Sequence, residues 1–169
     1  MKEKIKDLNS FLSFKVGNEI FAANVSNVIN ILEMVKITKV PKAPPYMLGV
    51  INLRGDVLPL VDFRIKLGIE NTEFTSNTCI LVLTVMFEDN YIMIGAVVDA
   101  VQEVLEIEDN EIKPPPSIQS GGINDFIIGM YKLNDELFLM ILDIDKILEK
   151  DELTEITKTS KASEKQNVL

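Results

Sequence analysis

The sequence predicts an all-β fold built from two similar small barrels. Three observations predict it: short runs rich in β-branched, aromatic and apolar residues, turn signals between these runs, and an internal repeat. The chain has 169 residues, of which 47% are hydrophobic, so it is long enough to bury a sizeable core. Its composition is that of a globular protein rather than a disordered one.

Eight runs are expected to form strands, and one of them is nearly continuously apolar. They are residues 11–16, 20–23, 47–53, 57–61, 79–87, 91–98, 127–133 and 137–142. The turn signals between them are Gly17-Asn18, Arg54-Gly55-Asp56, Glu88-Asp89-Asn90 and Asn134-Asp135-Glu136. The run 79–87 lacks polar alternation, which is typical of a strand covered on both faces.

The internal repeat divides the chain into two halves. Ala22, Val25, Val28, Ile31, Leu32, Glu33 and Pro41 match Gly95, Val98, Val101, Val104, Leu105, Glu106 and Pro114, all displaced by 73. Further matches are Leu48-Gly49-Val50 and Leu53 with Ile128-Gly129-Met130 and Leu133, displaced by 80, and Asp62 and Leu67 with Asp143 and Leu148, displaced by 81. We therefore expect a first barrel at about residues 11–67 and a second at about 78–150. Each is marginal in size alone, so the two should pack on each other.

The segments outside the strands are expected to be short helices and unstructured ends. Asp62 and Asp143 each precede a short amphipathic segment, where the carboxylate can accept hydrogen bonds from free backbone N–H groups at a helix start. Residues 1–10 are expected to form an N-terminal extension. Residues 151–169 are polar and lack a periodic apolar pattern, so a disordered C-terminal tail is expected.

The composition argues against most kinds of chemistry. There is no histidine, the lone Cys79 lies in an apolar strand, and no glycine-rich phosphate loop is present, so we expect no catalysis, no cofactor and no metal. Asp143-Ile144-Asp145 could be a metal pair, but a helix cap beside a solvated carboxylate explains it as well. A net charge of −9 argues against nucleic acid as a partner. No apolar run is long enough to span a bilayer and no signal sequence is seen, so a cytoplasmic protein is expected.

Two adjoining motifs carry a family resemblance. Gly49-Val50-Ile51-Asn52-Leu53-Arg54-Gly55 is followed by Leu58-Pro59-Leu60-Val61-Asp62-Phe63-Arg64. Together they resemble the signature of CheW-like domains. Flanking matches at Val40-Pro41, Ile112 to Pro116 and Leu142 to Leu148 extend the resemblance over about residues 10–150. It implies a CheW-like domain at 11–150, formed by two five-stranded barrels that share a hydrophobic core.

The resemblance also implies a function. CheW-like adaptors bind the regulatory domain of a CheA-type histidine kinase and the cytoplasmic tips of chemoreceptors. We therefore expect a non-enzymatic adaptor that is a monomer in isolation and joins array rings at the membrane through its partners, without inserting into it. Two alternatives stay open: an adaptor of another chemosensory pathway, such as one for pili or development, and, from another class, a small β-barrel enzyme or ligand carrier.

Arg54 is the first candidate for receptor binding. It lies in a turn, where its guanidinium could bond two oxygens of an acidic receptor tip. A surface arginine paired with a nearby aspartate is the alternative.

Three glycines and four strand residues complete the expected receptor site. In the family, glycines that correspond to Gly49, Gly95 and Gly129 border the groove between the barrels; a bulge or close backbone packing is the alternative. The family also places receptor contacts on the segment that holds Val28 and Asn30, often with an acidic residue at the position of Asn30. Ile80 and Val104, both assigned to the second barrel, could complete an apolar wall, or could be plain core.

The expected kinase contacts are Val57, Lys113 and Ile118. Lys113 and Ile118 flank Pro114-Pro115-Pro116, a stiff run that would display its neighbours at little entropic cost. The family uses this region for a second contact with the kinase, and a stiff connection between barrels is the alternative. Val57, just beyond the Arg54-Gly55 turn, is the candidate for the first kinase contact.

Overall fold

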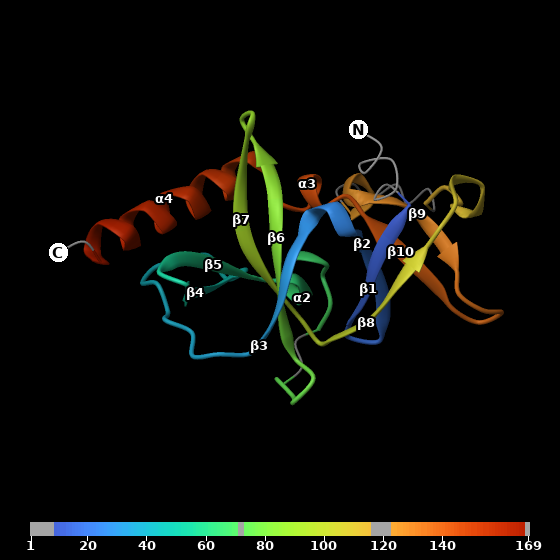
Figure 1. The fold of residues 1–169 in the computed structure, drawn as a ribbon, viewed down its shortest axis with the longest axis horizontal. Helices are drawn as coiled ribbons and strands as arrows, with labels where there is room; N and C mark the ends of the chain where they lie inside the picture. Colours follow the sequence, from blue (N-terminus) through green and yellow to red (C-terminus); the bar gives the residue numbers. More distant parts are fainter. Residues whose placement is uncertain (1–8, 71–72, 116–122, 168–169) are drawn as a thin grey trace.

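The computed structural model describes residues 9–70, 73–115 and 123–167, and the strands of these residues form two five-stranded sheets (Figure 1). The first sheet has the order β8-β1-β2-β10-β9 and is formed by β1 (Ser10–Val16), β2 (Glu19–Asn24), β8 (Ala100–Glu106), β9 (Ile127–Lys132) and β10 (Phe138–Leu142). The second has the order β3-β6-β7-β5-β4 and is formed by β3 (Val28–Glu33), β4 (Met47–Leu53), β5 (Asp56–Asp62), β6 (Cys79–Phe87) and β7 (Asn90–Val98).

Each sheet curls and is closed by one short bridge, and we call the first sheet barrel A and the second barrel B. In barrel B, Thr38 follows β3 and exchanges two backbone hydrogen bonds of 2.9 and 2.8 Å with Val50 of β4. In barrel A, Lys113 follows β8 and exchanges two of 2.8 Å with Met130 of β9. These bridges join the two edge strands of each sheet. The expected all-β fold of two five-stranded barrels is confirmed.

The boundary between the barrels differs from the expected one. The first copy of the repeat supplies β1 and β2 to barrel A but β3, β4 and β5 to barrel B. The second copy supplies β6 and β7 to barrel B and the other three strands to barrel A. The division into barrels at about 11–67 and 78–150 is therefore wrong, because each copy gives its first hairpin to one barrel and its last three strands to the other. The residue matches between the two copies show which strands are equivalent, but they do not show which barrel each strand joins.

The hydrophobic core has three parts, one of which belongs to both barrels. The shared part joins Phe14, Val16 and Phe21 of barrel A to Leu81 and Leu83 of barrel B. A second cluster fills barrel B and a third fills barrel A. Because side chains alternate along a strand, β6 sends Leu81, Leu83 and Val85 into the shared core and Ile80 and Val82 into barrel B. This explains the continuous apolar run 79–87.

The short helices begin where the aspartates predicted them. Asp62 caps α2 (Phe63–Lys66) by accepting a 2.9 Å hydrogen bond from the Arg64 backbone N–H. Asp143 caps α3 (Ile144–Ile147) by accepting one of 3.1 Å from Asp145 N–H. Three 3-10 helices, η1 (Val25–Asn27), η2 (Asp109–Glu111) and η3 (Ile123–Phe126), connect strands.

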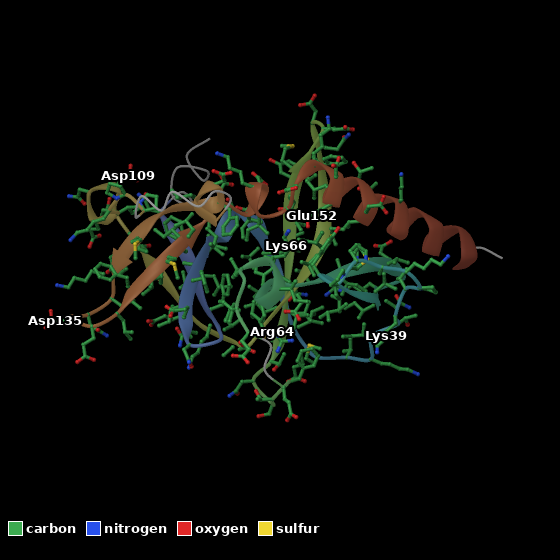
Figure 2. The ribbon with its side chains drawn as sticks, turned by 180° about the vertical axis from the view of Figure 1, so that it is seen from behind. Lys39, Arg64, Lys66, Asp109, Asp135 and Glu152 are labelled. Carbon is green, nitrogen blue, oxygen red and sulfur yellow. The ribbon has the colours of Figure 1, made fainter. Side chains whose placement is uncertain are left out.

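The C-terminal segment forms a helix, so the expectation of a disordered tail at 151–169 is wrong. Helix α4 (Lys150–Asn167) lies along barrel B (Figure 1) and buries Leu153 and Ile156 in the shared core. Lys66 of α2 holds it by an ion pair of 2.6 Å to Glu152 (Figure 2). Two apolar residues three apart are too weak a pattern to indicate a packed helix from the sequence. The expected N-terminal extension, residues 1–10, lies mostly outside the described residues.

None of the described helices is long and apolar enough to cross a membrane.

Candidate functional site

Arg54 stands at the tip of the hairpin that joins β4 to β5. Leu53 pairs with Asp56, so Arg54 and Gly55 are the two central residues of the turn, with φ values of 54° and 91°. Positive φ at both positions is the geometry of a type I′ turn, which matches the right-handed twist of the strands. The Asn52 side chain accepts a 2.8 Å hydrogen bond from Gly55 N–H and stiffens the turn. The Arg54 backbone is thus held in one conformation before any partner binds.

The two arginines of the chain have opposite environments. Arg54 is exposed, and no described carboxylate forms an ion pair with it, so the interpretation as a paired surface arginine finds no support. Arg64 is buried: its Nε and Nη2 each donate a 3.0 Å hydrogen bond to Asp62, and Phe74 lies over its guanidinium. The hydrogen bond to Asp62 raises the pKa of Arg64 further. Arg54 is therefore the arginine that a partner can reach.

The three candidate glycines are buried, and each allows a close approach of chain segments. A Cβ on Gly49 would collide with the backbone oxygen of Thr38, and one on Gly129 would lie 2.7 Å from that of Lys113. Both glycines therefore lie under the bridges that close the barrels. A Cβ on Gly95 would lie 2.5 Å from Leu60 Cδ2 and 2.8 Å from Ile80 Cγ2. This geometry supports the interpretation as close packing.

The edge strands β3 and β8 carry exposed apolar residues at equivalent positions of the repeat. Ile31 of β3 is 46% exposed and Val104 of β8, its match at a displacement of 73, is 59% exposed. Ile29, in the bulge of β3, is 52% exposed. Sequence reasoning missed Ile29 and Ile31, because an apolar residue in a strand is more often core than surface. Only their position on an edge strand leaves them open.

The other strand candidates are placed differently. Val28 is partly buried at the margin of the shared core. Asn30 is partly exposed, and its side-chain oxygen accepts a 2.8 Å hydrogen bond from Ile31 N–H, so it supports the bulge. Ile80 is fully buried inside barrel B. For Ile80 the alternative of plain core holds, so it does not line a groove wall, and its assignment to the same barrel as Val104 is wrong because Val104 belongs to barrel A.

The kinase candidates lie on different barrels, with Val57 on barrel B and Lys113 at the bridge that closes barrel A. Val57 is partly exposed on β5, three residues beyond Arg54. Lys113 is exposed, and its backbone forms the bridge to Met130. Ile118 lies outside the described residues. The structure thus places Lys113 against Gly129, and Val57 in the same hairpin as Arg54.

The residues considered for chemistry have structural roles. Asp145 accepts a 2.9 Å hydrogen bond from Met86 N–H, and Asp143 caps α3, so each carboxylate is engaged separately. Burial raises the pKa of the Cys79 thiol, which disfavours the reactive thiolate. Within the described ranges, no three acidic or cysteine side chains gather as metal ligands would.

Comparison with known proteins agrees with this architecture. The family model described as CheW-like domain matches residues 10–152, which is most of the chain. The chain belongs to the CheW-like domain family. Among its relatives, the chemotaxis protein CheW of Rhizobium meliloti is 35% identical over 83% of this chain and 88% of its own length. The chemotaxis protein CheW of Helicobacter pylori is 33% identical over 89% of this chain and 87% of its own length.

A solved structure shares the fold of this CheW-like domain. The crystal structure of the scaffolding protein TtCheW from Thermoanaerobacter tengcongensis superposes with a TM-score of 0.72 at 27% sequence identity. The match covers 85% of this chain and 96% of that one. The fold of two barrels is therefore shared with a protein described as a scaffold.

Proposed function

We propose that this chain is a non-enzymatic adaptor that couples chemoreceptors to a CheA-type histidine kinase at the cytoplasmic face of a membrane array. The observation that carries the proposal is the family match over residues 10–152, together with relatives named chemotaxis protein CheW that align along most of their length. The structural neighbour described as a scaffolding protein supports a binding role.

Receptor docking is assigned to Arg54 and to the apolar residues of the two edge strands. The exposed Ile31 and Val104 supply apolar surface from both barrels, and Arg54 supplies a positive charge on a stiff turn. A receptor tip that presents an apolar helix face with a carboxylate would match these groups. The buried glycines Gly49, Gly95 and Gly129 then shape the barrels and do not contact the receptor themselves.

Kinase docking is assigned to separate surfaces, with Val57 at one and Lys113 at the other. Because Val57 belongs to barrel B and Lys113 closes barrel A, one adaptor would be able to contact two kinase domains, as ring assembly requires. Val57 and Lys113 lie outside strands β3 and β8, but Val57 shares the β4–β5 hairpin with Arg54.

The test measures binding of the purified chain to a receptor tip and to the kinase regulatory domain in separate titrations. The wild type should bind both, and failure to bind either would refute the adaptor function.

Arg54→Asn tests the receptor assignment, because asparagine tolerates positive φ and the turn should survive. Loss of a hydrogen bond to a charged partner costs about 1.5–3 kcal/mol, which weakens receptor binding roughly ten- to hundredfold, while kinase binding stays unchanged. Lys42→Asn is the matched control, since Lys42 is another exposed cation with a positive φ of 60°. Normal receptor binding by Arg54→Asn would remove Arg54 from the site and leave the adaptor proposal standing.

A further inference from the structure

The β6–β7 hairpin is longer than its counterpart in the first copy of the repeat. Ala22 and Gly95 are equivalent, and they pair with Ser13 and Val82. From that pair the β1–β2 ladder continues for three more pairs, to Val16 and Glu19. The β6–β7 ladder continues for five, to Phe87 and Asn90. The two additional pairs carry the hairpin beyond the barrels, where it projects from the molecule (Figure 1).

The projecting hairpin has one covered face and one open face. Val85, Phe87 and Ile92 turn toward the shared core. Met86 lies opposite Tyr91, and Thr84 lies opposite Met93, so these four side chains occupy the other face. On that face Met86 is 38% exposed, Met93 is 39% exposed and Tyr91 is 68% exposed. We call Met86, Tyr91 and Met93 the hairpin patch.

The β6 edge of the projecting hairpin is occupied, and its turn is tight. Strand β3 covers the edge of β6 only as far as Leu83, and beyond it Asp145 accepts the 2.9 Å hydrogen bond from Met86 N–H. This carboxylate blocks the addition of another strand at that edge. Glu88 and Asp89, with φ values of 49° and 64°, form a tight two-residue turn. On the β6 side, a partner must therefore approach the face of the hairpin rather than its edge.

The β6–β7 hairpin and the chain on either side of it carry only acidic charges, although Lys146 of α3 is exposed next to Asp145. Residues 67–112 contain ten Asp and Glu and neither Lys nor Arg, so this segment holds more negative charge than the net −9 of the whole chain. Glu88 and Asp89 at the tip and Asp145 beside Met86 are exposed. A partner that covers the patch gains from positive charges around an apolar centre and is opposed if it is acidic.

We propose that the hairpin patch docks an amphipathic helix of a partner protein, with an apolar stripe flanked by Lys or Arg. An apolar sheet face is covered most simply by a helix, tyrosine is a frequent anchor at interfaces, and the flexible methionines adapt to the helix surface. None of Met86, Tyr91 and Met93 is among the residues assigned to receptor or kinase, so the proposal goes beyond the coupling function.

The test uses three synthetic helical peptides and the full-length chain labelled with ¹⁵N. One peptide has a leucine stripe flanked by lysines, and the second has glutamates in place of the lysines. The third has the same composition as the first, but its residues are reordered so that the leucines no longer form a stripe. The lysine peptide should bind saturably and shift amide signals within residues 84–93. The other two should bind at least about tenfold more weakly. Equal binding of all three, or shifts confined to β8, would overturn the proposal.

Variants separate the patch from general attraction to an acidic protein. Tyr91→Ser combined with Met93→Ser should weaken the lysine peptide at least about tenfold. Ile128→Ser, which removes an apolar side chain that is 53% exposed on barrel A, should have no effect. Receptor-tip and kinase titrations of the double variant should match those of the wild type. If the double variant binds the receptor tip or the kinase more weakly, the patch is part of a coupling surface and is not a separate site. If the wild type binds neither the receptor tip nor the kinase, the coupling function fails, and the peptide result still stands by itself.

Discussion

Replacing Ile156 by alanine tests whether α4 belongs to the folded core. Ile156 is 1% exposed, and it packs in the shared cluster that also holds Leu153 and Phe63. The substitution removes three carbons, which is worth about 2.5 kcal/mol of transfer free energy at about 0.8 kcal/mol per methylene. A cavity adds to this loss, and measured values for such substitutions are roughly 2–5 kcal/mol. We expect the free energy of unfolding to fall by about 3 kcal/mol.

The assay is urea denaturation followed by far-ultraviolet circular dichroism. Lys158→Ala on the same helix is the matched control, because Lys158 is exposed and should change stability by less than about 0.5 kcal/mol. Truncation after Leu153 removes Ile156 and most of α4, so it should destabilise at least as much as the point substitution. A loss below about 1 kcal/mol for both Ile156→Ala and the truncation would show that α4 does not support the core.

Three further predictions concern single side chains. Gly49→Ala should lower the free energy of unfolding by more than about 2 kcal/mol, because the new Cβ meets the Thr38 backbone. Gly55→Ala has open space around its Cβ and should cost only the roughly 1 kcal/mol of a positive φ. Thermal denaturation compares the two variants, and equal losses would contradict the prediction. Burial, with help from Glu152 and Glu155, raises the pKa of Tyr46 to about 12, so the native state keeps a proton that the unfolded chain releases near pH 10. Its contribution to stability is complete below about pH 10 and declines as the pH rises to about 12; the Tyr46→Phe protein should lose less stability over this interval in parallel urea titrations, and identical losses would refute the assignment. Cys79, whose thiol pKa is raised by burial, should react with iodoacetamide at least about tenfold more slowly in the native protein than in urea, and equal rates would show that the strand exposes it.

Local chemistry predicted much of this fold. The alternation of apolar residues and the turn residues predicted eight of the ten described strands, and only β3 and β8 were missed. Their residues appeared in the repeat but not as strands, because polar residues and exposed apolar ones interrupt the usual pattern of a half-buried strand. The caps at Asp62 and Asp143 depend on neighbours two residues away, so the sequence alone sufficed for them.

The candidate site could be predicted only in part. The motif from Gly49 to Gly55 marked the correct hairpin, and its Arg-Gly pair indicated a tight turn. Whether a glycine borders a groove or lies under a closing bridge depends on Thr38 and Lys113, which are distant in sequence. Likewise Ile80 and Ile31 are both isoleucines in neighbouring strands, yet Ile80 is core because it faces the interior of barrel B, whereas Ile31 is surface on the edge strand β3.

The amino-acid sequence by itself determined the β-rich class, the repeat and the turns, since these follow from side-chain shape, backbone conformation and short-range hydrogen bonding. The tertiary structure alone decided which hairpin enters which barrel. Both copies of the repeat offer equivalent pairing edges: β1 pairs with β8 as β6 pairs with β3, and β2 pairs in parallel with β10 as β7 does with β5. Pairing within a copy or between copies therefore satisfies the same local pattern. The choice is made by long-range contacts, chiefly the shared core that the exchanged hairpins build between the barrels.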